Sequence, residues 1–160
     1  MEEYLATLPI EVTILRPNLF LQGLLAFAPT VRAEGWFGAP IGDRVSAIDI
    51  RDIAEVAAVV LTETGHAGRV HDLTGPRAVT HKEIADAISG AVGRELEFRD
   101  LPAEAFRKAL EGVLPPWQAD GLVEAYAHYA RGEVAAVSPA VEQVTGRAAH
   151  DAVFRPTVDG

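Results

Sequence analysis

The hydrophobic pattern of this chain alternates between two kinds of segment. Short apolar runs rich in β-branched residues predict buried strands over residues 12–15, 45–48, 69–73 and 96–98. Between them, apolar residues recur at helical spacing and predict intervening helices. The resulting order is β-α-β-α-β-α-β, followed by further helices and without internal repeats. This order indicates one α/β domain with a helical C-terminal portion.

Sequence signals mark where several helices begin. Asp49 can cap a helix whose apolar positions repeat every three or four residues. Those positions are Ile53, Val56, Ala57, Val60 and Leu61. Thr80 and Glu83 have the spacing of a capping box, in which each residue bonds an N–H group of the other. Ser138 before Pro139 predicts a last short helix that ends near residue 146.

A further helix is predicted over residues 19–31, with a disturbance at Pro29. The glycine-rich segment that follows, residues 35–42, is predicted to be a looped turn. It is also the nearest imitation of a phosphate-binding loop. However, its glycine spacing is wrong, Pro40 lies inside it, no strand leads into it and no helix follows. We therefore expect no phosphate site there.

Composition narrows the class of protein. Lys and Arg number 14 against 23 Asp and Glu, for a net charge of −9, so binding to nucleic acid or to an anionic membrane is not expected. There is no cysteine, which removes disulfides, thiolate nucleophiles and cysteine-ligated metals. No apolar run reaches the roughly 18 residues of a membrane span, and the N-terminus is acidic where a signal peptide is basic. We expect a soluble, cytoplasmic protein.

Several phrases of the sequence occur in a recognisable order. They read L-R-P-N-L-F over residues 15–20, G-D-R-V-S-A-I-D-I-R-D-I-A over 42–54, H-D-L-T-G-P over 71–76, T-H-K-E-I-A over 80–85, L-P-P-W-Q-A-D-G-L over 114–122 and V-T-G-R over 144–147. Each phrase alone is weak evidence. Together, the chain resembles the NmrA-like branch of the atypical short-chain dehydrogenases.

The resemblance implies an NAD(P)-binding fold of the Rossmann type, with a small helical region on the substrate side. It covers the C-terminal half of the family's length only, so the N-terminal phosphate-binding half is expected to be absent. Residues 1–75 would be the remainder of the α/β part of this single domain, and residues 76–160 the mostly helical part. The family implies NAD(P)H as cofactor. The substrate and the choice between NADH and NADPH stay open.

The resemblance places a candidate cofactor site at Arg16, Pro17 and Asn18, because the corresponding loop of the family lies near the nicotinamide. Ligands of open α/β sheets bind beyond the carboxyl ends of the strands, and this loop follows the first predicted strand. A structural alternative stays open, in which Pro17 ends the strand and Asn18 caps the next helix. The two interpretations are compatible.

A candidate substrate pocket comprises Phe20 and Gln22, with Tyr126 and His128 from a later helix. Core packing is the alternative for Phe20, and a surface or packing role is the alternative for His128. Many relatives have an asparagine where Gly23 stands. A ligand contact that this asparagine makes in the relatives is therefore not expected in this chain.

Other candidate groups favour structural roles. Asp49 and Asp52 lie at a helix start. Carboxylates at this position can cap the helix, and they are stabilised by the positive end of its dipole. The tyrosine and lysine pair of orthodox short-chain dehydrogenases, four residues apart, is absent, so no proton donor is assigned. The five histidines show no metal-binding spacing, and no metal site is expected.

Two functions are compatible with these features. The first is an NAD(P)H-dependent reductase of quinone-like or other small molecules, present as its C-terminal half. The second is a non-catalytic module that senses the cofactor or pairs with another chain. An α/β sheet cut in its middle exposes a strand edge and an apolar face. We therefore expect a homodimer or a partner that supplies the N-terminal half, and weak or no NADPH binding by this chain alone.

Overall fold

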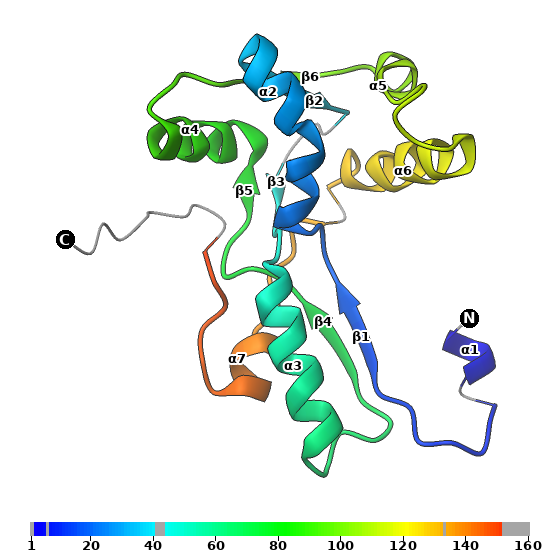
Figure 1. Ribbon diagram of the computed structural model, residues 1–160. Coiled ribbons are helices and arrows are strands. Elements are labelled where there is room, and N and C mark those ends of the chain that lie inside the picture. The colour runs from blue at the N-terminus through cyan, green and yellow to red at the C-terminus, as the bar shows by residue number, and fades with distance from the viewer. Residues whose placement is uncertain (1, 6, 41–43, 133, 152–160) are drawn as a thin grey trace.

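The computed structural model describes residues 2–5, 7–40, 44–132 and 134–151 (Figure 1). Its lower part in that view is a parallel pair of strands, β1 (Ile14–Pro17) and β4 (Val70–Leu73), with α3 (Ile50–Thr62) and α7 (Ala140–Thr145) beside it. The upper part holds the remaining strands and helices, apart from the short N-terminal α1 (Glu2–Leu5). No helix of the described residues is long and apolar enough to cross a membrane.

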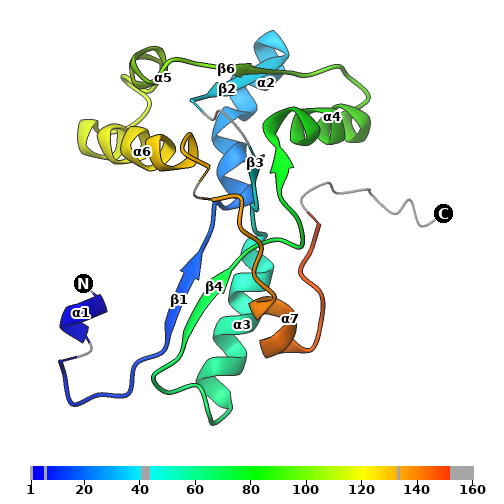
Figure 2. The same ribbon diagram turned by 180° about the vertical axis from the view of Figure 1, so that it is seen from behind.

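One face of the β1–β4 pair is covered and the other is open. Leu15 and Leu73 pack with Val56 of α3 and Val141 of α7 in one apolar cluster. Figure 2 shows the opposite face with no helix over it, and Val70 on that face is largely exposed. Parallel sheets are normally covered on both faces, so this pair is covered to only half the usual extent.

The first strand lies two residues later than the predicted 12–15, because its pairing with β4 fixes its limits. The N–H group of Ile14 donates to the carbonyl oxygen of Arg69, just before β4, and that of Asn18 donates to the carbonyl oxygen of Leu73, the last residue of β4, both at 2.9 Å. In a parallel ladder alternate residues bond to one neighbour, so the missing N–H of Pro17 falls on the other edge. Pro17 is therefore tolerated as the last strand residue. No described strand pairs with that other edge of β1.

The glycine-rich segment is not simply a turn, and this prediction was wrong. Residues Trp36–Ala39 form β2, which pairs in parallel with β6 (Glu97–Asp100). A Cβ atom on Gly38 would lie 2.7 Å from the carbonyl oxygen of Arg99. This glycine therefore permits close approach of two segments. Gly35 does end a helix in the left-handed conformation, and residues 41–43 lie outside the described part.

The predicted helix over residues 19–31 is divided in two. A 3-10 helix, η1 (Leu21–Phe27), is followed by α2 (Ala28–Glu34). Pro29 lies in the first turn of α2, where its missing N–H is not needed. The predicted disturbance is therefore a junction between two helices, and the second helix extends three residues further than expected.

The second predicted strand, 45–48, is shorter than expected. Only Arg44–Val45 forms a strand, β3, and it pairs antiparallel with β5 (Val79–Thr80), which the hydrophobic pattern did not reveal. Ile48 instead makes an isolated parallel bridge with Phe20. Between them, the carbonyl oxygen of Ala47 would lie 2.2 Å from a Cβ atom on Gly75. The chain segments before α3 and after β4 thus touch backbone to backbone.

The helix signals mostly locate the helices correctly. Asp49 accepts a hydrogen bond from the N–H of Arg51 at the start of α3, and both bonds of the capping box open α4 (His81–Val92). Leu61 is 83% exposed, so it does not belong to the buried face of α3. The remaining helices are α5 (Ala103–Ala109) and α6 (Pro116–Tyr129). The division of the domain at residue 75 stays a prediction, and α7 packs back against α3 and β4.

His81 gives this fold an expected acid sensitivity. Its ring is buried against Phe98, with centroids 5.0 Å apart, and neither ring nitrogen has a hydrogen-bond partner among the residues that the structure describes. Burial lowers the pKa of His81 from 6.5 to about 4. The unfolded chain therefore binds a proton below about pH 6.5 that the folded protein takes up only near pH 4.

We expect this difference to lower the free energy of unfolding as the pH falls from 6.5 toward 4, by about 2–3 kcal/mol at pH 4.5. Denaturant unfolding of the wild type and of His81→Phe at pH 7 and pH 4.5 measures it. The variant should lose less stability between the two pH values than the wild type. An equal loss in both proteins would show that His81 is not the source.

Candidate functional site

A polar cleft lies at the carboxyl ends of β1 and β4. It has a volume of about 490 Å³. Arg16, Pro17 and Asn18 line it from β1, Asp72 and Thr74 line it from the end of β4, and Tyr129 and residues 134–138 close it. The structure therefore brings all three predicted cofactor-binding residues to one cleft.

Asn18 makes three side-chain hydrogen bonds in this cleft. Its Nδ2 donates to Ser46 Oγ at 2.8 Å and to the carbonyl oxygen of Val134 at 2.9 Å. Its Oδ1 accepts from the N–H of Leu19 at 2.7 Å. It does not cap η1, which begins after Phe20 without a side-chain cap. Asn18 instead ties three chain segments together behind the wall of the cleft.

Two buried hydroxyl groups that the sequence analysis missed complete this framework. Ser46 donates to the carbonyl oxygen of Ala136 at 2.6 Å, and Thr74 accepts from the N–H of Ser138 at 2.9 Å. Ser46 lies inside an otherwise apolar run, in the phrase V-S-A-I-D, whereas Thr74 directly follows the strand β4, in the phrase D-L-T-G-P. A small hydroxyl residue in such a run was the available signal, since a buried hydroxyl needs a partner.

Arg16 supplies the positive charge of the cleft. Its side chain is half exposed, it is paired with Glu2, and its guanidinium lies 3.8 Å from Asp72. The Arg16 guanidinium holds the pKa of Glu2 below its usual range. An exposed arginine bound to surface carboxylates can exchange them for an anionic ligand at small cost.

The four predicted substrate residues do not line one cavity. Phe20 is 44% exposed. Gln22 accepts a hydrogen bond from the N–H of Ile50 at 3.1 Å and lines a groove on another side of η1. Tyr126 lines a separate, partly open cavity, whereas His128 is exposed beside Arg131. The structure therefore separates residues that the sequence analysis grouped.

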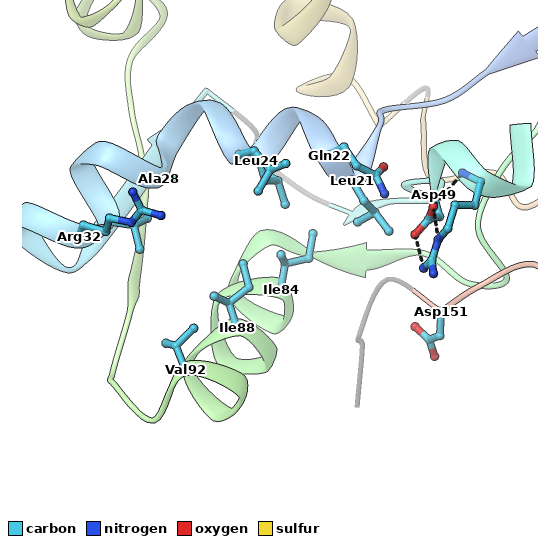
Figure 3. Close-up of a pocket in the computed structure, with 13 residues that line it drawn as sticks. Leu21, Gln22, Leu24, Ala28, Arg32, Asp49, Ile84, Ile88, Val92 and Asp151 are labelled. Carbon is cyan, nitrogen blue, oxygen red and sulfur yellow. Dashed lines mark hydrogen bonds and ion pairs between the residues drawn. The ribbon is translucent and has the colours of Figure 1, made fainter. Parts of the chain in front are cut away.

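The groove next to Gln22 runs between η1, α2 and α4 and holds about 480 Å³ (Figure 3). Leucines of η1 face isoleucines of α4 across it. Arg32 lies at one end and the ion pair of Asp49 with Arg51, 2.8 Å, at the other. In Figures 1 and 2, α4 lies on the side of the molecule away from β1 and α6. This groove is therefore distinct from the polar cleft.

A second cavity, here called the Tyr126 cavity, holds about 210 Å³ between η1, α2, β2, α5 and α6. Residues that line it include Leu19, Gly23, Trp36, Phe37, Phe106 and Tyr126. Burial raises the pKa of Tyr126 to about 12, so its hydroxyl keeps its proton. Because Leu19 follows Asn18 directly, this cavity adjoins the polar cleft.

The two aspartates at the start of α3 have different roles. Asp49 is the helix cap, as predicted, and the Arg51 side chain lowers its pKa to about 2. Asp52 is fully buried and accepts from the backbone N–H of His150 at 2.8 Å. His150 Nδ1 and the Arg147 guanidinium also lie at its carboxylate, at 2.6 and 3.3 Å. Asp52 lies in the first turn of α3, as predicted, but its carboxylate anchors the C-terminal segment instead of capping the helix.

Parallel strands that end at a polar cleft, with a helix packed on one face, define a nucleotide-binding α/β architecture of the Rossmann type. The chain belongs to the NmrA-like family, whose profile matches residues 1–157. This finding confirms the resemblance drawn from the sequence phrases.

Known proteins of this kind are similar over most of the chain. It is 39% identical to an NAD(P)H azoreductase of Xenophilus azovorans and 38% identical to (4-alkanoyl-5-oxo-2,5-dihydrofuran-3-yl)methyl phosphate reductase of Streptomyces griseus, covering 86% of this chain and 49% of each relative. The crystal structure of an NADPH-dependent quinone oxidoreductase from Escherichia coli superposes with a TM-score of 0.87 at 28% identity, over 95% of this chain and 56% of that one. The chain thus spans about half the length of these relatives.

Proposed function

We propose that this chain is the substrate-side half of an NAD(P)H-dependent reductase that acts in the cytoplasm on quinone-like or other small molecules. The observation that carries the proposal is the polar cleft at the carboxyl ends of the parallel strands β1 and β4, where Rossmann-type folds bind their cofactor. The NAD(P)H-dependent relatives support the choice of cofactor.

The residues of the cleft fit one end of such a cofactor. Arg16 offers a half-exposed cation, and Thr74 and the segment around Ser138 offer polar groups. Within the described ranges, no strand leads through a glycine-rich turn into a helix, which is what a pyrophosphate needs. We therefore assign the nicotinamide end to this chain and the phosphates to another polypeptide segment.

The cofactor would supply the hydride, and this chain would supply position. Asn18, Ser46 and Thr74 fix residues 134–138 over the strand ends through hydrogen bonds across more than 60 residues of sequence. A wall held in this way keeps its shape when the cleft is filled. Tyr129 closes the cleft from α6 and limits access of water.

The open edge and open face of the β1–β4 pair support a partner. We propose that they receive either the N-terminal half of the fold or a second copy of this chain. The unpaired edge of β1 presents backbone groups, and unpaired edges are rarely left uncovered.

A chimaera tests the function. The N-terminal portion of the Escherichia coli quinone oxidoreductase is placed before Met1 of this chain, and NADPH oxidation with 1,4-naphthoquinone is measured. We expect turnover by the chimaera and none by this chain alone. Arg16→Gln should raise the KM for NADPH about tenfold, whereas Arg32→Gln, in the groove on the other side, should not. A chimaera that binds NADPH without oxidising it would contradict the reductase and favour the non-catalytic module.

A further inference from the structure

We propose that the Tyr126 cavity binds an uncharged, planar compound of one or two fused rings, whose hydrogen-bond acceptor is held by the Tyr126 hydroxyl. The statement that this compound is the substrate rests on the proposed function. The binding itself depends only on residues of this chain.

The size of the cavity limits the ligand. An apolar cavity of about 150 Å³ holds benzene, and pockets for drug-sized ligands have about 300–1,000 Å³. At about 210 Å³, the Tyr126 cavity lies between the two. One ring or two fused rings therefore fit, and a larger ring system does not.

The walls of the cavity set the chemistry of the ligand. Among the residues that the structure describes, no charged side chain lines it, so an ionic ligand would lose its hydration without compensation from these walls. Trp36, Phe37 and Phe106 contribute aromatic surfaces, which favour a flat ring packed edge-to-face or offset. An uncharged aromatic compound matches these walls.

Tyr126 is the polar group that gives the cavity specificity. The residue is only 4% exposed. No hydrogen bond among the described residues involves its hydroxyl, which is nevertheless not one of the fully buried atoms that lack a partner. Its ring is held by edge contacts with Phe106 at 5.0 Å and Tyr129 at 5.3 Å. A tyrosine hydroxyl that lines a cavity and is not engaged by the protein can donate to an acceptor atom of a ligand.

The location of the cavity connects it to the polar cleft. Tyr129, which contacts the Tyr126 ring, lines the cleft, and Leu19 of the cavity is bonded to Asn18 of the cleft wall. A ligand in the cavity would therefore lie next to the place proposed for the nicotinamide.

Gly23 allows the cavity to be filled without disturbing the fold. It lines the cavity, and no atom lies within 4 Å of the position that its Cβ would take. A leucine at this position should occupy the cavity itself. Gly121 provides a matched control, because it is exposed on α6, its Cβ position is equally open, and it does not line the cavity.

The test uses the full chain without cofactor, so its outcome is independent of reductase activity. The probes are 1-indanone and indane, which share a ring system and differ in one carbonyl group. The readout is the indole N–H signal of Trp36 in nitrogen-15 NMR spectra, with that of Trp117 as internal reference. Trp36 lines the cavity, whereas Trp117 lies outside it and is 73% exposed.

We expect 1-indanone to shift the Trp36 signal saturably and to leave Trp117 unchanged. Indane should bind about two- to tenfold more weakly, since it lacks the hydrogen bond. Tyr126→Phe should reduce the affinity for 1-indanone to that for indane, and leave indane binding unaltered. Gly23→Leu should abolish binding of both probes, whereas Gly121→Leu should retain it.

Three results would overturn the proposal. They are equal affinity of the wild type for the two probes, 1-indanone binding that survives Gly23→Leu, and parallel shifts of both indole signals. The dispersion of the remaining NMR signals shows for each variant whether it is folded. A Gly23→Leu or Tyr126→Phe protein with native dispersion is therefore a valid test.

Discussion

Replacing Gly75 by alanine is expected to destabilise the fold by about 3 kcal/mol or more. The new Cβ atom would lie 2.2 Å from the carbonyl oxygen of Ala47, a distance that no relaxed structure accommodates. The contact is with backbone, so a side-chain rotation cannot relieve it. The segments leading into α3 and out of β4 would have to separate, and the bond from the N–H of Gly75 to the carbonyl oxygen of Ser46, 3.2 Å, would weaken.

Urea unfolding monitored by circular dichroism measures the change. Gly90→Ala is the control, because Gly90 lies in α4 with open space around its Cβ position. That substitution should stabilise the protein by about 0.5–1 kcal/mol. If the Gly75→Ala protein unfolds at the same urea concentration as the wild type, the close contact between Gly75 and Ala47 is contradicted.

The second large effect is expected for Asp52→Asn, which should lower the free energy of unfolding by about 3 kcal/mol. The carboxylate is fully buried and is shared by His150 and Arg147, which hold the C-terminal segment against α3. An amide of the same shape removes the negative charge and presents a donor to groups that are themselves donors.

Glu55→Gln is the matched control for this charge. Glu55 lies one turn further along α3 and pairs with the same Arg147, but the side chains of that pair are both about 40% exposed. Exposed ion pairs contribute about 0–1 kcal/mol, so the control should lose little stability. Equal losses for Asp52→Asn and Glu55→Gln in urea unfolding would show that burial of Asp52 does not dominate.

The sequence predicted well whatever depends on neighbouring residues. The cap at Asp49 and the capping box of Thr80 with Glu83 involve residues two or three positions apart, so their geometry follows from spacing alone. The apolar run that became β4 was also recognisable. The order of the phrases identified the NmrA-like family before the structure was considered.

Long-range pairings account for most of what the sequence did not predict. The segment around Gly38 read as a turn because its partner strand, β6, lies about sixty residues later. Capping of the next helix was one of two interpretations left open for Asn18, but its partner Val134 is 116 positions away. Asp52 likewise bonds residues 95 and 98 positions away. No local pattern encodes such contacts.

The candidate site shows the same limit. Arg16, Pro17 and Asn18 line one cleft because they are consecutive at the end of a strand, and their role in cofactor binding stays a prediction. Gln22 and Tyr126 were grouped from two different helices, and periodicity shows which face of a helix is apolar without showing which cavity it lines. The two residues face different spaces. Their roles in substrate binding stay predictions.

The central claim is that NADPH binding requires a phosphate-binding segment in addition to these 160 residues. Calorimetric titration of NADPH into this chain alone, and into the chimaera that carries the N-terminal portion of the quinone oxidoreductase, tests it most directly. We predict no saturable NADPH binding by the chain alone, and a dissociation constant for NADPH in the micromolar range for the chimaera. Micromolar binding by the chain alone would contradict it.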